Sequence, residues 1–321
     1  MDINFIKNSK GLFVFSDPGG AKPILSFIIN NKLSNYKIFS DRKYEFYSDF
    51  NLDVNFFNDF SIEKLLLDYK PDYLFTGTSY TSKIEVKFLK FSEKINIKTY
   101  SYIDHYTNYE GRFNFKNKIY LPDNLLLIDN KAKRIALKTK LSTVSNIHVC
   151  SNFYHEFLKN WKPKTERSKL IDGLCIDENK SIVVLAPDPI SNINGKKKYN
   201  YDEYDVSDDL LSSLENIDQD NFILIIKTHP NQDTQFKNYL IKKYKKKNMY
   251  FYQENSCIDL LFHLDIIVGM FSSILIEANL FSKKIIRHIP SDKMDDPIRH
   301  LNIGEVSKSQ NELKKILTKI L

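Results

Sequence analysis

The sequence predicts an α/β fold made of two doubly wound, parallel-sheet domains that face a cleft. Short apolar runs alternate with segments of helical period, this alternation occurs twice, and a charged stretch of low periodicity separates the two series. A chain of 321 residues is long enough for two domains of about 150 residues each. We therefore expect a Rossmann-like N-terminal domain at 1–158, a linker at 159–180 and a Rossmann-like C-terminal domain at 181–321.

The first series opens with a strand, a tight turn and a helix. Residues 11–16 form an apolar run, Asp17-Pro18-Gly19-Gly20 has the composition of a turn, and an apolar helical pattern then reaches Ile29. The same reasoning predicts helices at 62–69, 81–93 and 131–140, and strands at 72–77, 98–103, 124–128 and 146–150.

The second series repeats this alternation after the charged stretch. Strands are expected at 181–186, 222–227, 249–252 and 265–269, and helices at 206–214, 233–244, 256–263 and 273–281. An amphipathic pattern at 309–321 predicts a closing helix, which we expect to pack back on the N-terminal domain. The acidic segment 201–205 is interpreted as a solvated loop.

Composition places the chain among globular proteins of the cytoplasm. Hydrophobic residues make up 42% and charged residues 27%, and the three cysteines form no CxxC pair. We find neither a cleavable leader nor an apolar run near the roughly 18 residues of a membrane span. The net charge of +7 includes basic runs at 195–198 and 242–247, interpreted as a solvated face with peripheral contact to an anionic membrane as the alternative. Nucleic acid is not an expected partner, because no recognised binding module accompanies the charge.

Two short motifs in the second half carry the functional hypothesis. His229-Pro230 follows one predicted strand, and Ser272-Ser273 follows a later strand and opens a helix. Open α/β sheets bind ligands at the carboxyl ends of their strands, and hydroxyls beside free helix amides suit a phosphate. We expect His229 to donate a hydrogen bond to the phosphate of a departing nucleotide. The other expected donor-binding residues on this side are Asp188, Lys227, Pro230 and Glu277, the last for ribose hydroxyls.

This outline resembles the GT-B glycosyltransferases that use CMP-activated acidic sugars, such as bacterial sialyltransferases, polysialyltransferases and Kdo transferases. The resemblance rests on His229-Pro230, on Ser272-Ser273 and on Tyr109-Glu110-Gly111, which is similar to an acidic-acidic-Gly motif except that tyrosine occupies its first position. It implies a metal-independent, inverting transfer of a nonulosonic acid or Kdo-type sugar to a glycan or glycolipid of the capsule or lipopolysaccharide. No cofactor is implied.

The first half supplies the candidates for the acceptor side. Asp104, His105, Glu110 and Arg112 place four ionisable groups within nine positions after a predicted strand. Asp104 and Glu110 compete as the base that deprotonates the acceptor hydroxyl, and Arg112 is the candidate cation for a donor carboxylate.

The turn that opens the first half adds a third base candidate. Asp17 follows the first predicted strand and is expected at the ligand-binding edge. Gly19 and Gly20 are expected to let the backbone approach a ligand closely.

Three alternatives stay open. A CDP-polyol phosphotransferase of the teichoic acid type has the same outline but transfers the phosphate together with the polyol. A nucleotide-sugar epimerase has two Rossmann-like halves and needs no acceptor. A non-catalytic nucleotide- or glycan-binding scaffold would bind nucleotide without releasing it from an activated donor.

Overall fold

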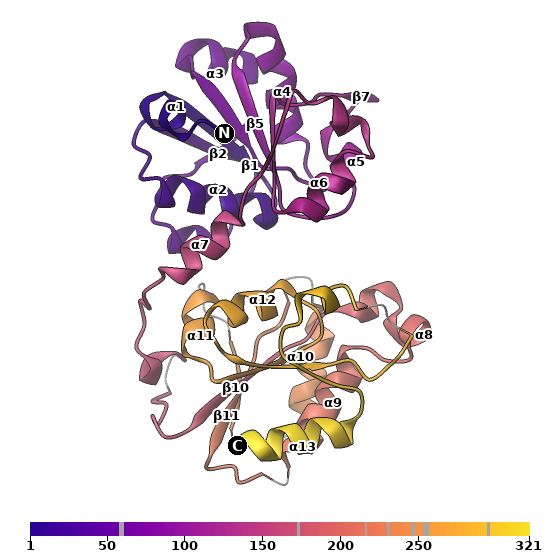
Figure 1. Cartoon of the computed structure of the whole chain (residues 1–321). Coiled ribbons are helices and arrows are strands. Elements are labelled where there is room, and N and C mark those ends of the chain that lie inside the picture. The colour runs from indigo at the N-terminus through magenta and orange to yellow at the C-terminus, as the bar shows by residue number, and fades with distance from the viewer. Residues whose placement is uncertain are drawn as a thin grey trace. The chain divides into compact units, whose positions relative to one another are not determined.

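The chain folds into two compact α/β units, Met1–Trp161 and Lys162–Leu321 (Figure 1). The computed structural model describes residues 1–57, 61–171, 174–215, 217–229, 232–244, 248–252, 257–293 and 296–321. The first unit ends at Trp161, whose ring packs against Phe157 with 5.4 Å between the ring centroids.

The first unit is built on a seven-stranded sheet in which all strands are parallel. Its strand order is β3-β2-β1-β4-β5-β8-β9, so the chain first winds outward from β1 on one side and then resumes on the other. The strands are β1 (Gly11–Phe15), β2 (Tyr36–Ser40), β3 (Asn55–Phe56), β4 (Tyr73–Thr76), β5 (Lys98–Ile103), β8 (Asn124–Leu127) and β9 (Asn146–Val149). A separate antiparallel hairpin joins β6 (Asn114–Phe115) to β7 (Lys118–Ile119).

Helices cover both faces of the first sheet. One face buries aliphatic side chains such as Leu12, Leu74 and Leu125 under one set of helices. The other face is aromatic, with Phe75 stacked on Tyr100 and in contact with Phe27. The helices of this unit are α1 (Ile3–Asn8), α2 (Pro18–Asn30), α3 (Ile62–Tyr69), α4 (Ile84–Ile95), α5 (Tyr109–Phe113), α6 (Asn130–Ala136) and α7 (Phe153–Lys159).

The second unit repeats the architecture with a six-stranded, all-parallel sheet. Its order, β12-β11-β10-β13-β14-β15, again starts in the middle and changes side after the third strand. The strands are β10 (Ser181–Ala186), β11 (Phe222–Ile226), β12 (Met249–Phe251), β13 (Ile266–Gly269), β14 (Lys284–His288) and β15 (Glu305–Ser307).

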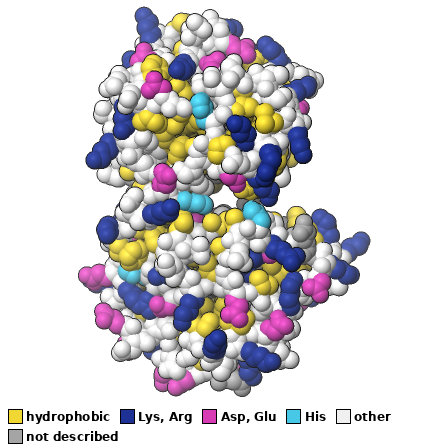
Figure 2. Space-filling model, in the orientation of Figure 1, with side chains coloured by type: hydrophobic (Ala, Val, Ile, Leu, Met, Phe, Trp, Pro, Cys, Tyr) yellow, Lys and Arg dark blue, Asp and Glu magenta, His cyan; other side chains and the backbone are white. Residues whose placement is uncertain are grey.

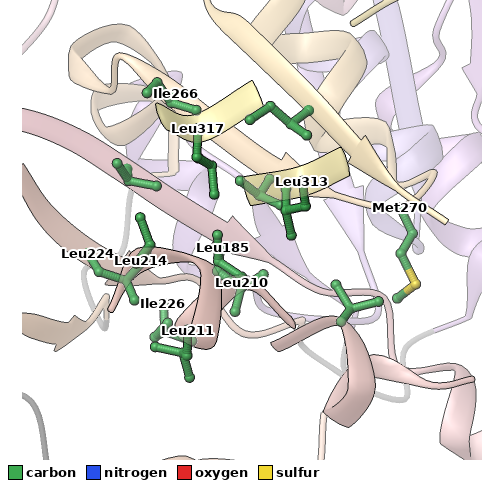
Figure 3. Close-up of a cluster of buried hydrophobic side chains, with 14 of the residues drawn as sticks. Leu185, Leu210, Leu211, Leu214, Leu224, Ile226, Ile266, Met270, Leu313 and Leu317 are labelled. Carbon is green, nitrogen blue, oxygen red and sulfur yellow. The ribbon is translucent and has the colours of Figure 1, made fainter. Parts of the chain in front are cut away.

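Side chains alternate between two cores in this second sheet. Leu185, Leu224 and Ile226 face α9 and α13, as Figure 3 shows, while Val184 and Ile225 face α11 and α12. Such alternation follows from the two-residue period of a strand. The helices are α8 (Gly195–Tyr199), α9 (Glu203–Leu214), α10 (Thr234–Lys243), α11 (Cys257–His263), α12 (Ser273–Leu280) and α13 (Gln310–Ile320).

The predicted linker and closing helix both pack in the second unit. Leu170 and Ile176 of the linker are buried in the core on the α11–α12 side, and Arg167 forms an ion pair with Asp265 at 2.6 Å. Helix α13, for which we expected packing on the N-terminal domain, buries Leu313 and Leu317 beside α9 (Figure 3). Residues 162–180 therefore belong structurally to the second unit.

Four parallel strands, β2, β3, β14 and β15, were not recognised in the sequence. Strand β14 contains Arg287 and His288, and both are fully buried because acidic partners offset their charge or polarity. Arg287 forms an ion pair with Asp296, and the ring of His288 hydrogen-bonds to Asp209 at 2.9 Å and to Ser307 at 2.7 Å. Two charged or polar residues at a strand end broke the apolar pattern on which the prediction relied.

Candidate functional site

Each sheet has one point at which the direction of winding changes, and the candidate residues gather there. In the first unit this point lies between β1 and β4, and in the second it lies between β10 and β13. The loops at the carboxyl ends of these strands diverge and leave room for ligands in open α/β sheets. Asp17 follows β1 and Asp188 follows β10, so the two aspartates occupy the same topological position in the two units.

Asp188 holds the turn that contains the serine pair. Asp188 is 7% exposed, and its Oδ2 accepts a hydrogen bond from the backbone N–H of Phe271 at 3.1 Å. Burial raises the pKa of Asp188 to about 6, although hydrogen bonds from the backbone at 270–272 and from the Ser272 hydroxyl lower it. The carboxylate thus ties the loop after β10 to the loop after β13.

The serine pair begins α12, as predicted. Ser272 is the N-cap residue, but its side chain makes no capping hydrogen bond and is directed to Asp188 instead. Ser273 is the first helical residue and is exposed. The free amides of the first turn and the Ser273 hydroxyl are therefore available to a phosphate. Glu277 is 8% exposed and lies one turn further along the same helix.

His229 lies in the loop after β11, on the other side of β10 from the serine pair. Burial, together with Lys227, lowers the pKa of His229, so the neutral imidazole predominates at pH 7. Lys227 donates to the carbonyl of Thr228 at 3.3 Å. Pro230 lies outside the described residues. Since neighbouring strands are about 5 Å apart, the loops of β11 and β13 are separated by roughly 10 Å.

A fully buried glutamate, Glu203, fixes the His229 loop to its neighbour. It accepts hydrogen bonds from the backbone N–H and hydroxyl of Ser191, at 2.9 and 2.5 Å, and from Gln232 at 3.0 Å. The backbone N–H of Gln232 in turn donates to the carbonyl of His229 at 2.9 Å. The segment 201–205 is therefore not a solvated loop: Tyr201 and Glu203 are buried, and Asp202 caps α9.

In the first unit, Asp17 makes the corresponding contacts between two loops. Its carboxylate accepts hydrogen bonds from the backbone N–H of Tyr80 at 2.9 Å and from the hydroxyl of Thr81 at 2.7 Å. It also forms an ion pair with Arg42 at 2.6 Å. These contacts join the loop after β1 to the loop after β4, which explains why α4 begins at Ile84 rather than at Thr81.

Asp104 lies against the first turn of α2. A Cβ atom added to Gly19 would stand 2.0 Å from Oδ2 of Asp104, and one added to Gly20 would stand 3.2 Å from the Cα of Gly77. Protein atoms thus occupy the space beside both glycines. Close packing therefore accounts for glycine at these two positions, where we had expected a close approach to a ligand. Burial raises the pKa of Asp104, while Arg112, 3.4 Å away, opposes this rise.

The remaining candidates of this segment point to different partners. Glu110 accepts a hydrogen bond from the backbone N–H of Lys140 at 2.9 Å, at the start of the 3-10 turn Lys140–Thr143. His105 is exposed and bonds Thr107 at 3.0 Å. Arg112 donates to the carbonyl of Thr78 at 2.6 Å. The structure therefore brings Asp104 and Arg112 together at the switch point and engages Glu110 with a neighbouring turn.

The sequence analysis missed the hydroxyl-rich loop after β4. Ser79 accepts a hydrogen bond from the backbone N–H of Asp17 at 3.0 Å and donates to the buried carboxyl of Glu85. Burial raises the pKa of Glu85 to about 7, with smaller contributions from the hydrogen bond to Ser79, which lowers it, and from Asp41 and Asp17, which raise it. The signal was present, since Thr78, Ser79, Thr81 and Ser82 directly follow a strand.

Several solved structures have the same two-unit fold as this chain. The UDP-GlcNAc 2-epimerase of Methanocaldococcus jannaschii is 14% identical, with a TM-score of 0.67 over 96% of this chain and 92% of that chain. The enzyme of Neisseria meningitidis, bound to UDP-GlcNAc, is 13% identical, with a TM-score of 0.68 over 97% and 91%. These likenesses define the class of fold, a GT-B-like fold with two parallel α/β sheets. Residues 155–320 match the model for CDP-glycerol:poly(glycerophosphate) glycerophosphotransferase, just over half of the chain, and the chain belongs to that family.

Family membership corrects the ranking of the hypotheses. A transferase that acts on a CDP-activated substrate was the second possibility, and the family match supports it better than the sialyltransferase-like transfer of a CMP-sugar. The glycotransferase of kitacinnamycin has the same fold at 8% identity and a TM-score of 0.54, covering 97% of this chain and 90% of that one. Because epimerases and a transferase share the fold, fold alone does not decide the activity.

Two further findings bear on the chain as a whole. The comparison with curated proteins finds no match. Each helix within the described ranges is too short or too polar to cross a lipid bilayer.

Proposed function

We propose that the protein transfers a polyol phosphate from a CDP-activated donor, of the CDP-glycerol type, to a hydroxyl group of a polyol-phosphate polymer. The observation that carries this proposal is the family match over residues 155–320, which spans His229 and the serine pair. The second unit binds the donor and places its diphosphate at the start of α12. The exposed hydroxyl of Ser273 and the helix amides then stabilise the negative charge.

The chemistry is a single displacement at phosphorus. The acceptor oxygen forms a bond to the phosphorus that carries the polyol, the diphosphate P–O bond breaks, and CMP departs with the bonding electrons. The proton of the acceptor hydroxyl passes to a base. Interactions that strengthen as charge moves onto the leaving phosphate lower the barrier.

Two groups are suited to the proton transfers. His229 is neutral at pH 7, so one ring nitrogen donates and the other accepts, and it can hydrogen-bond the departing phosphate or take the acceptor proton. Asp104 of the first unit is the carboxylate that we favour on the acceptor side, because its pKa is raised and Glu110 is engaged elsewhere. Asp17 is already paired with Arg42 and is the weaker candidate.

Product analysis tests the proposal. The protein is incubated with a poly(glycerophosphate) acceptor and, in parallel, with CDP-glycerol, CMP-sialic acid or UDP-GlcNAc. We expect CMP release and new phosphodiester signals in the ³¹P NMR spectrum with CDP-glycerol alone. CMP release from CMP-sialic acid without a new phosphodiester would restore the glycosyltransferase hypothesis.

Two controls separate the remaining alternatives. Conversion of UDP-GlcNAc to its C2 epimer without any acceptor would identify an epimerase. Binding of CDP or CMP with no turnover of any donor would support the scaffold alternative. Omitting the polymer controls for simple hydrolysis of the donor.

A further inference from the structure

An open depression of about 460 Å³ lies on the first unit, next to the candidate acceptor residues. Three segments form it: the loop after β4, the start of α5 and the β6–β7 hairpin. The loop after β4 donates a backbone hydrogen bond to Asp17, and the loop after β5 contains Asp104. The lining residues that matter for recognition are Tyr80, Lys83, Asn108, Phe115, Lys116 and Asn117.

Positive charge is concentrated at this depression. Lys83 donates to the carbonyl of Gly111 at 2.9 Å, which holds its ammonium group at the wall. The ammonium groups of Lys87, Lys90 and Lys116 lie 5.9, 5.6 and 5.8 Å from the ring centroid of Phe115. Figure 2 shows Lys and Arg side chains over the part of the first unit where Figure 1 draws α5, α6 and β7.

The turn of the β6–β7 hairpin fixes the backbone position of Lys116. Lys116 and Asn117 form its two-residue turn with φ angles of 51° and 62°, both in the left-handed region. Paired left-handed residues are typical of the tight turns that match strand twist. Among the described residues that line the depression there is no carboxylate. Lys83 and Lys116 line the depression, and Lys87 and Lys90 lie near the ring of Phe115 in its wall. These cations repel one another, and a bound anion relieves the repulsion.

The lining also indicates which kind of anion fits. Lysine binds phosphate as a point charge, and the amide groups of Asn108 and Asn117 can hydrogen-bond hydroxyl groups. The volume is within the range of about 300–1,000 Å³ that small-ligand sites have. Several separated cations suit a chain with repeated negative charges better than a single compact anion.

We propose that this depression binds a phosphodiester unit of the acceptor polymer and so positions the polymer's terminal hydroxyl for transfer. The inference rests on the proposed function and names the binding residues for its acceptor. Lys83 and Lys116 contact the phosphate, and the asparagines contact the adjoining polyol.

The first test is direct binding without any donor. Fluorescently labelled poly(glycerophosphate) is titrated into the full-length protein, into Lys83→Gln/Lys116→Gln, and into the control Lys7→Gln/Lys37→Gln, which has the same charge change. Lys7 lies in α1 and Lys37 is the second residue of strand β2, and neither lines the depression. We expect at least tenfold weaker binding for the first variant alone, with the wild-type affinity falling as salt rises. Equal binding by the two double variants overturns the inference.

The second test is kinetic. The variant Lys83→Gln/Lys116→Gln should raise KM for the polymer at least tenfold, leave KM for CDP-glycerol unchanged, and match wild type with free glycerol as acceptor. If neither wild type nor variants turn over CDP-glycerol, but polymer binding still depends on Lys83 and Lys116, the proposed function is rejected and the polymer-binding site is retained. If the variant Lys83→Gln/Lys116→Gln loses binding to phosphatidylglycerol vesicles but still binds the polymer, the inference is overturned, and the depression binds a membrane surface instead.

Discussion

Asp17 and Asp188 occupy equivalent positions in two sheets of the same topology, yet the two units neutralise them differently. Asp17 is partly exposed and is paired with Arg42. Asp188 is buried, its pKa is raised, and in the described part of the chain no lysine or arginine forms an ion pair with it. Its hydrogen bonds come from the turn that holds Ser272.

The difference indicates what each turn does. The first turn carries its own cation, so its charge is balanced before any ligand binds. The second turn is organised by hydrogen bonds alone, which leaves the amides of α12 as its positive end. This suits a donor phosphate in the second unit and a neutral hydroxyl in the first.

The largest effect is expected for His229. Replacing His229 with alanine should reduce kcat about 10²- to 10⁴-fold, because a positioned proton donor or acceptor is lost next to the reacting phosphate. Steady-state kinetics with CDP-glycerol measure this, and an unchanged circular dichroism spectrum controls for folding. Near-normal turnover would show that His229 does not take part in the reaction.

The next effect concerns the buried carboxyl behind the first turn. The pKa of Glu85 is raised from 4.5 to about 7 in the folded protein, so the folded state binds more protons than the unfolded state between these values. Stability from this group therefore falls as pH rises from about 4.5 to 7, by on the order of 3 kcal/mol. Glu85→Gln should raise the thermal midpoint at pH 8 and leave it nearly unchanged at pH 4.5. An equal shift at both pH values would contradict this assignment, and Glu93→Gln, at an exposed position of α4, serves as the control.

The smallest effect compares the two aspartates directly. Asp188→Asn should raise KM for CDP-glycerol about tenfold, the equivalent of one hydrogen bond to a charged group, because the Ser272 turn loses its ionised acceptor. Asp17→Asn should leave this KM unchanged and lower stability by about 1 kcal/mol or less through its half-exposed ion pair, less so at high salt. Similar donor KM values for both variants would show that the two turns are not specialised.

Sequence patterns predicted most of this fold because the strands are short, apolar and followed by periodic helices. Helix α3 and strands β5 and β10 have the expected bounds. Strand β14 was missed because Arg287 and His288 are buried with acidic partners, Asp296 and Asp209, that lie outside the strand. Pairing of this kind is a tertiary property that a local pattern does not encode.

The candidate residues lie at strand ends as expected, but the contacts that support them were not predicted. His229, Ser272 and Asp188 could be found because polar residues directly follow apolar runs. Glu203 was misread because an acidic segment in isolation resembles a solvated loop, whereas its burial depends on Ser191 and Gln232. Which acceptor-side carboxylate is accessible also depended on packing, since Glu110 is engaged by the turn at Lys140.

Trp161, the last residue of the first unit, is the chain's one tryptophan and is 8% exposed. Its indole is therefore a built-in optical probe at the boundary of the two units. Emission excited at the red edge of protein absorption reports this single position without labelling, so a titration with donor or acceptor can be followed in the unmodified protein.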